Sequence, residues 1–285
     1  MKNYDLLIIG SGIVGSALSF YSSLQNKKVL VLEKNFAGYN SSGNAQGGLA
    51  PYLGNDLNVK KLHQYSYDLH TEFKNNYKEY TRINPQYNKK SLIHIFKNEN
   101  EKTDLISNGF DKKDFFDLHE LQKLEPKLKK ADYGAIIFDE YMEVDSYNLT
   151  NSFKDSSVNL GAEYVNFNFS MNSLNIKDEI IESININNEE LKFKNIAITA
   201  GPWTNELAKN NDEINVKPLK GQLLKAETDS HFKNSFSWSK DYATKKYDNF
   251  LWIGTTEEDV NFQEGTTEEA RKEILDSFNE IFAGF

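Results

Sequence analysis

The chain contains no cysteine among its 285 residues. Disulfide bonds, thiolate zinc sites, a cysteine nucleophile and a cofactor attached through sulfur are therefore excluded. Long apolar runs are lacking as well, because the run from Leu6 to Ile9 is closed by Gly10 and is much shorter than a signal-peptide core or a membrane span. From these absences we expect a cytoplasmic protein with no membrane partner.

Basic residues are fewer than acidic ones, at 33 Lys and Arg against 42 Asp and Glu, which gives a net charge of -9. This charge opposes nonspecific attraction to phosphate backbones, so we expect no stable nucleic-acid partner. Apolar residues make up 39% of the chain, which is enough for a hydrophobic core. At about 150 residues per domain, the length predicts one large domain or two interleaved domains. The oligomeric state does not follow from these values.

A glycine-rich turn after the first apolar run predicts a dinucleotide-binding site. The run Leu6 to Ile9 is typical of a buried strand, and the small, apolar stretch to Leu24 is typical of a helix. Between them, the first glycine permits a sharp turn, the second lets a pyrophosphate approach the backbone, and the third lets helix and strand pack closely. A second apolar run ends at Glu33, where an acidic residue binds the adenosine ribose.

The sheet that begins with these two strands is interrupted by an insertion. A nicotinamide-binding domain would continue with regularly alternating strands and helices. Here a small-residue loop leads to an amphipathic helix, whose repeating face consists of Val59, Leu62, Ser66, Leu69, Phe73 and Tyr77. The next candidate for a central strand is residues 195–199. Because strand signals intervene at residues 91–96, 134–138 and 180–186, we predict a second domain inserted into the first.

The sequence resembles the D-amino-acid-oxidase-type family of FAD-dependent amine oxidoreductases. The resemblance rests on the glycine turn, the Glu33-Lys34 pair, the loop after it, Leu124-Glu125-Pro126 and residues 198–203. It implies an α/β fold in which a Rossmann-like FAD-binding domain carries an inserted α+β substrate domain, dominated by a mixed or antiparallel sheet. The implied bounds are about 1–80 and 134–212 for the FAD-binding domain, about 81–133 and 213–265 for the substrate domain, and 266–285 for a terminal helix, with the usual C-terminal FAD segment absent.

The same resemblance implies the residues that contact the cofactor. They are Gly10, Ser11, Gly12, Ile13, Val14, Gly15, Glu33, Lys34, Ser42, Gly43, Asn44, Gln46, Gly47, Gly48, Ala200 and Gly201. We expect noncovalent FAD, because no histidine lies in residues 41–51, where some relatives carry a flavin-linked one. The histidines, at positions 63, 70, 94, 119 and 231, are expected to serve packing or surface polarity. The sequence identifies no catalytic residue and predicts no metal site.

Residues 42–53 carry a closer resemblance within the family. They are similar to the S-G-N-x-Q-G-x-L-x-P-x-L segment found in the oxidoreductase halves of bifunctional enzymes of tRNA 5-methylaminomethyl-2-thiouridine biosynthesis. This resemblance implies oxidation of an amine C–N bond, with hydride transfer to the flavin and hydrolysis of the imine. The implied substrate is the carboxymethylaminomethyl group of a wobble uridine in modified tRNA.

Two alternatives stay open. A glycine or D-amino-acid oxidase acting on small free amines needs no nucleic-acid surface, which suits the acidic charge. A truncated, inactive FAD-binding remnant is the other, because the resemblance implies a further glycine-rich flavin segment beyond Phe285. The final helix is expected to begin with a capping box from Thr266 to Glu269.

Overall fold

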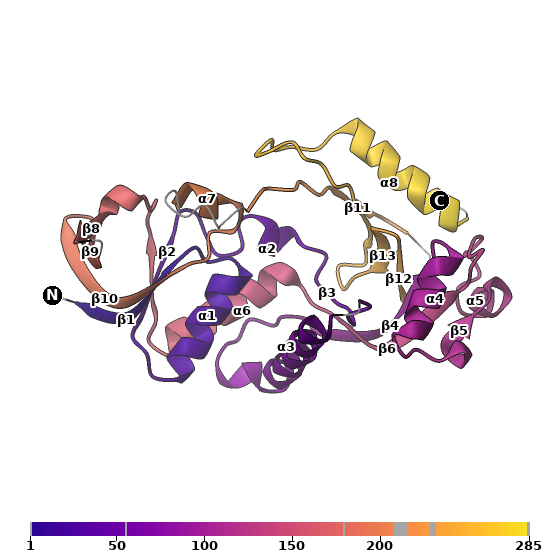
Figure 1. Ribbon diagram of the computed structural model, residues 1–285, viewed down its shortest axis with the longest axis horizontal. Coiled ribbons are helices and arrows are strands. Elements are labelled where there is room, and N and C mark those ends of the chain that lie inside the picture. The colour runs from indigo at the N-terminus through magenta and orange to yellow at the C-terminus, as the bar shows by residue number, and fades with distance from the viewer. Residues whose placement is uncertain (1, 55, 179, 208–215, 229–231, 284–285) are drawn as a thin grey trace. The chain divides into compact units, whose positions relative to one another are not determined.

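The described part of the chain forms two compact units, and each is discontinuous in sequence (Figure 1). The computed structural model describes residues 2–54, 56–178, 180–207, 216–228 and 232–283. The first unit consists of Met1–Gly47, His70–Tyr87 and Val144–Lys217. The second consists of Gly48–Leu69, Asn88–Glu143 and Pro218–Phe285.

A six-stranded sheet with the order β7-β2-β1-β10-β9-β8 forms the centre of the first unit. Its first four strands run parallel, and β9 and β8 continue it antiparallel. The strands are β1 (Asn3–Ile9), β2 (Val29–Glu33), β7 (Glu163–Asn166), β8 (Leu174–Lys177), β9 (Ile180–Ile186) and β10 (Glu189–Ile198). The prediction that residues 195–199 supply the next central strand of this sheet is thus confirmed, since Ile198 pairs with Ile9 at the carboxyl ends of parallel strands.

Helices α1 (Ile13–Leu24) and α6 (Ser146–Asn159) pack against each other in this unit (Figure 1). Both helices bury small hydroxyl side chains, which leave little bulk between the helices and their neighbours: Ser16, Ser19, Ser23, Ser152, Ser156 and Ser157. Next to them, the Phe20 ring contacts Phe73, Tyr80 and Phe153 at centroid distances of 5.2–5.6 Å. These aromatic contacts anchor residues 70–87 to the first unit.

The second unit is built on an eight-stranded mixed sheet with the order β11-β14-β13-β12-β4-β6-β3, with β5 also paired to β6. Its neighbours are antiparallel except for the parallel pair β12 and β4. The strands are β3 (Gly48–Leu49), β4 (Asn88–Ile95), β5 (Phe115–Phe116), β6 (Ala135–Glu143), β11 (Leu223–Ala226), β12 (Ser235–Trp238), β13 (Asp241–Lys245) and β14 (Leu251–Gly254). With the first unit, this sheet confirms the predicted α/β fold class.

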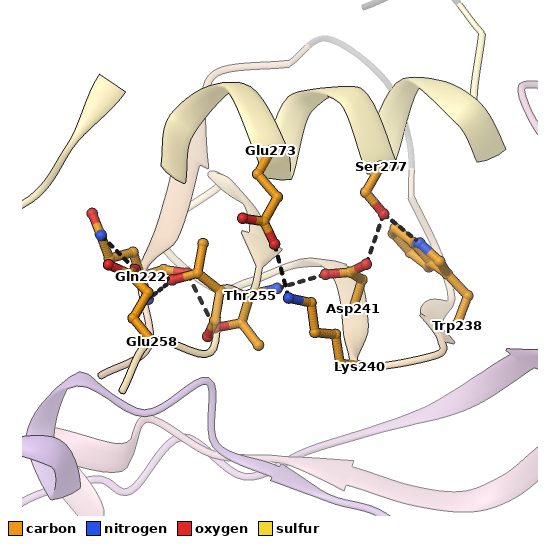
Figure 2. A network of polar contacts seen from close by, with 9 residues as sticks. Gln222, Trp238, Lys240, Asp241, Thr255, Glu258, Glu273 and Ser277 are labelled. Atoms are coloured by element: carbon orange, nitrogen blue, oxygen red, sulfur yellow. Dashed lines mark hydrogen bonds and ion pairs between the residues drawn. The ribbon is translucent and has the colours of Figure 1, made fainter. Parts of the chain in front are cut away.

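Helix α8 (Glu268–Ile281) covers one face of the second sheet. Its buried side chains Ile274, Phe278 and Ile281 join the core formed by the strands. Polar contacts align it, because the Ser277 hydroxyl accepts from Trp238 Nε1 at 3.0 Å and donates to Asp241 at 2.7 Å (Figure 2). Lys240 also pairs with Glu273 at 2.8 Å along the same helix (Figure 2).

The predicted capping box of α8 is wrong by one residue. Thr267, and not Thr266, is the N-cap, and its hydroxyl accepts from the backbone N–H of Ala270. The N–H of Thr267 donates to the Gln222 side chain at 2.9 Å. A side chain from another part of the second unit therefore replaces the glutamate that a capping box supplies.

The remaining helices are short, apart from α3. They are α2 (Ser41–Asn44), α3 (Leu57–Asn76), α4 (Glu99–Ser107), α5 (Leu118–Leu124) and α7 (Thr204–Leu207), with single 3₁₀ turns at Tyr77–Glu79, Lys112–Asp114, Met171–Ser173 and Gly201–Trp203. The amphipathic face expected on α3 is buried only at Phe73, whereas Leu62 is 66% exposed and Val59 is 38% exposed. No helix in the described ranges has both the length and the apolar character needed to cross a bilayer.

The domain bounds expected from the sequence stay predictions. The chain passes from one compact unit to the other at positions that differ from these bounds. Because β6 pairs with β4, residues 135–143 belong to the second unit. Residues 48–69 also fall in the second unit, and residues 81–87 fall in the first.

His70 and Tyr87 form a half-buried pair at the two ends of the stretch that returns to the first unit, with His70 Nδ1 2.8 Å from the Tyr87 hydroxyl. Burial lowers the pKa of His70 and raises the pKa of Tyr87. The neutral imidazole is therefore the form that the fold stabilises.

We predict that His70 makes stability depend on pH. Folding lowers the pKa of His70 from 6.5. Its contribution to the free energy of unfolding is therefore complete above pH 6.5 and is lost as the pH falls below 6.5. Thermal denaturation at about pH 7.5 and about pH 5.5 measures the loss. His70→Gln, which keeps a hydrogen-bonding side chain without titrating, should reduce it. An equal pH dependence in both proteins would contradict the assignment.

Candidate cofactor-binding site

The glycine turn lies at the carboxyl ends of β1 and β10. Gly10 has a φ of +100°, a conformation that glycine adopts without strain, and its N–H donates to Leu32 O at 2.8 Å. The Thr199 hydroxyl donates to the Gly10 carbonyl at 2.9 Å and lies 3.0 Å from the Ile9 carbonyl. Three parallel strands thus hold the turn at the sheet edge where α/β folds bind ligands.

Gly12 and Gly15 differ in what surrounds them. A Cβ atom on Gly15 would lie 2.0 Å from the Gly10 carbonyl oxygen and 2.6 Å from Thr199 Oγ1, so this glycine is required for packing. A Cβ on Gly12 would meet only the Ser42 side chain, with the Oγ at 3.0 Å. The backbone at Gly12 is therefore open to close approach by a group other than protein.

The N-terminus of α1 has donors available for an anion. Ser42 Oγ accepts from the Ile13 N–H at 2.9 Å, but the N–H groups of Gly12, Val14 and Gly15 have no hydrogen-bond partner in the described part of the chain. No acidic residue occupies the first turn, and Val14 is 64% exposed. Free N–H groups at a positive helix end fit a pyrophosphate.

Glu33 stands beside the same turn, at the end of β2. Its Oε2 accepts from the Ser11 N–H at 2.8 Å and from the Ser11 hydroxyl at 3.1 Å, while Oε1 accepts from the Asn35 N–H at 2.9 Å. A carboxylate has about four acceptor positions, so it has capacity left for a ribose hydroxyl. The adjacent Lys34 side chain is exposed, and its carbonyl accepts from Asn166.

The loop after β2 returns to the glycine turn through the short helix α2. Ser42 reaches the N-terminus of α1, and a Cβ on Gly43 would lie 2.0 Å from the Gly38 carbonyl oxygen. The Asn44 side chain donates to Asn40 O at 2.9 Å. The loop is then held by Ser146, whose hydroxyl lies 2.7 Å from the Ala45 carbonyl.

The structure brings most of the predicted cofactor residues into the first unit. The glycine turn, Glu33 and Ser42 are joined by hydrogen bonds, and Ala200 follows Thr199 at the end of β10. Gly201 is exposed, with a φ of +56°. Gln46 and Gly47 complete the first-unit part of the loop, whereas Gly48 lies in β3 of the second unit.

Sequence reasoning missed Thr199 and Ser146 as organisers of this site. Thr199 bonds the carbonyls of the glycine turn, and Ser146 bonds the carbonyls of the loop. The position of Thr199 just before Ala200 could have indicated its role. Nothing in the local pattern around Ser146 indicates that it contacts residues about a hundred positions earlier.

His70, the histidine of the first unit, bonds Tyr87 and forms no hydrogen bond with this turn in the described part of the chain. His94 lies in β4 of the second unit, where its ring contacts Ser237 at 2.8 Å and Glu101 at 3.0 Å, and this hydrogen bond lowers the pKa of Glu101. His119 is exposed, and His231 lies outside the described residues. Within the described ranges no group of His, Asp and Glu residues could hold a metal ion. The catalytic residue therefore stays unassigned.

Comparison with known proteins identifies the family. The family model described as FAD dependent oxidoreductase matches residues 5–285. The chain belongs to this family. FAD is the family's cofactor, and the free N–H groups at the start of α1, the open backbone at Gly12 and the carboxylate of Glu33 fit a dinucleotide.

Individual relatives of this family are similar at low identity. The bifunctional protein ThiO/ThiG of Trichormus variabilis is 24% identical over 268 residues, which are 90% of this chain and 40% of that protein. Glycine oxidase of Bacillus licheniformis is 22% identical over 80% of this chain and 62% of its own. The chain thus spans less than two thirds of these curated relatives. The solved glycine oxidase of Bacillus cereus shares the fold, with a TM-score of 0.86 and 22% identity over 98% of this chain and 78% of its own.

We predict that alanine at Gly15 affects stability, whereas alanine at Gly12 affects FAD binding. Gly15→Ala should lower the free energy of unfolding by about 3 kcal/mol, because its Cβ meets backbone. Gly12→Ala should leave stability nearly unchanged and weaken FAD binding by about tenfold or more. Thermal denaturation and fluorescence titration with FAD measure the two effects. Unchanged FAD affinity in Gly12→Ala would refute the placement of the phosphates.

A second prediction concerns the charge of Glu33. Glu33→Gln should weaken FAD binding roughly tenfold, because charged hydrogen bonds contribute about 1.5–3 kcal/mol against 0.5–1.5 kcal/mol for neutral ones. Glu33→Ala should weaken it further and also destabilise the turn, since the N–H groups of Ser11 and Asn35 lose their acceptor. Titration of the apoprotein with FAD is the measurement. Glu163→Gln in the neighbouring strand β7 is the matched control and should bind FAD like the original chain.

Proposed function

We propose that this chain binds FAD noncovalently at the glycine turn and takes part in oxidising the C–N bond of a small amine. The observation that carries the proposal is the arrangement of three unpartnered N–H groups, those of Gly12, Val14 and Gly15, with Glu33 and Ser42 around one turn. When bound, FAD would supply the acceptor for a hydride from the carbon next to the amine nitrogen. Hydrolysis of the resulting imine and reoxidation by oxygen would complete the reaction.

The residues of the chain have binding and orienting roles in this proposal. The N–H groups of Gly12 and Val14 would bind the pyrophosphate, and Glu33 would accept hydrogen bonds from the ribose. Thr199 and Ser42 keep the turn and the loop in place, which leaves the helix end ready for an anion without rearrangement. No protein group is assigned to proton transfer.

A small free amine, such as glycine, is the substrate class that the observations favour. The similarity to a glycine oxidase extends over most of the chain. The net charge of -9 also suits a small substrate better than a polyanion. A cytoplasmic location belongs to the same proposal, supported by the absence of cysteine.

The second candidate is the carboxymethylaminomethyl group of a tRNA wobble uridine. Residues 42–53 support it through their resemblance to the tRNA-modifying subgroup. The same hydride and imine chemistry would then release the carboxymethyl group as glyoxylate. Binding to tRNA would require a local basic surface, because the net charge of the chain is unfavourable.

One experiment separates the two substrates. We expect the purified chain with FAD to show flavin absorption and to release peroxide with at least one of glycine, sarcosine, D-alanine and iminodiacetate. Omitting FAD gives the control. Release of glyoxylate from tRNA bearing the carboxymethylaminomethyl group, with no turnover of free amines, would instead establish the second candidate. A chain that stays colourless after FAD addition would refute both.

A further inference from the structure

A buried ion pair lies in the second unit and has no role in the site described so far. Lys90 of β4 places its Nζ 2.9 Å from Glu143 Oε2 of β6, and the two side chains are 9% and 3% exposed. Lys90 also donates to the Thr244 hydroxyl at 3.2 Å and to the Lys245 carbonyl. Its ammonium group therefore has three partners, the number it can bond.

The carboxylate of Glu143 is equally satisfied. Its Oε1 accepts from Ser235 Oγ at 2.7 Å, from the Thr244 hydroxyl, and more weakly from the Tyr141 hydroxyl at 3.3 Å. Side chains of β4, β6, β12 and β13 thus converge on one buried charge. Because an apolar pair of similar size would avoid the cost of desolvating two charges, stability alone does not explain this network.

A register shift in the sheet accounts for the direction of Glu143. Leu92 pairs with Phe138, but Lys90 pairs with Tyr141, so β6 has one residue more than β4 between these pairs. The extra residue is a β-bulge, and it reverses which face the following residues of β6 occupy. It therefore turns Glu143 to the face that carries Lys90. Breaking the ion pair removes the interaction that favours this register over its alternatives.

The backbone around Glu143 supports residues 41–48 of the loop after β2, which we call the cofactor loop. Met142 and Glu143 pair with Leu49 and Gly48 in β3, and the N–H of Val144 donates to the Gly47 carbonyl at 2.9 Å. The Ser146 hydroxyl then contacts the Ala45 carbonyl. Consecutive residues of one segment thus hold consecutive positions of the loop, and a shift in the register of β6 would shift the loop with it.

We propose that Lys90 and Glu143 are positioning residues for the Gly47–Gly48 part of the cofactor loop. Gly47 has a φ of +78°, and because glycine has no side chain its backbone conformation is not restricted locally. The ion pair restricts it from the adjacent strand by holding the register of β6. The link to FAD rests on the proposed function, whereas the link to the loop backbone rests on the hydrogen bonds alone.

The test compares single and double replacements of the pair. Lys90→Met leaves an unpaired buried carboxylate and should lower the melting temperature, while Lys90→Met with Glu143→Leu should restore much of it. We expect the double variant still to bind FAD about tenfold more weakly, because the loop is no longer held in one register. The amide of Val144 should also exchange faster with solvent in the FAD-free protein.

A neighbouring exposed pair provides the control. Lys89 and Glu140, on the same strands, are 3.0 Å apart with side chains 50% and 77% exposed. Lys89→Met should change neither FAD affinity nor exchange at Val144, and Glu140 is kept because it lies in the bulge of β6. If the double variant does not fold, Glu143→Gln takes its place. Glutamine keeps the contacts with the hydroxyl groups but removes the charge, so we expect a smaller loss of FAD affinity.

Each outcome decides the proposal. If the double variant, or Glu143→Gln in its place, has both the FAD affinity and the Val144 exchange rate of the original chain, the pair has no positioning role. If the original chain binds no FAD, the proposed function fails, and exchange at Val144 alone decides the role of the pair. Faster exchange in the buried-pair variant but not in the exposed-pair control supports positioning.

Discussion

The close approach of α1 to the ends of β1 and β10 is the constraint on which the cofactor site depends. The space between the Gly10 carbonyl and the first turn of α1 excludes even one methyl group at Gly15. This contact directs the free N–H groups of the helix toward the carboxyl edge of the sheet. The Thr199 hydroxyl and the Glu33 carboxylate then bond to the same turn, so that the proposed anion site consists of backbone N–H groups.

The loop after β2 depends on a second constraint, which is the strand-like segment around residues 142–146. Carbonyls of the loop accept from Val144 and Ser146, and Gly48 continues as a strand against β6. Since the loop contains several glycines, its own sequence does not select one conformation. Its conformation is instead selected by hydrogen bonds to a segment that is distant in the chain.

Local patterns predicted the parts of the fold that depend on neighbouring residues. The run to Ile9, the glycine turn and the run ending at Glu33 correctly predicted two strands and the helix that ends at Leu24, because strand burial and turn geometry are encoded within a few residues. Periodicity was less informative for α3, whose repeating face is exposed at Leu62 and buried at Phe73. The N-cap of α8 was also misplaced, because the Gln222 side chain bonds the N–H of Thr267.

The sequence by itself determined the α/β class, the family resemblance and the position of the glycine turn between β1 and α1, since glycine spacing and apolar runs have direct steric meaning. Tertiary structure decided which partners complete that turn: Ser42 at the helix end, Thr199 against the glycine carbonyls, and Ser146 against the loop. It also decided that Lys90 and Glu143 meet in the core of the sheet. These contacts join residues far apart in the chain, and they follow from strand order and from one bulge in β6, which no local pattern records.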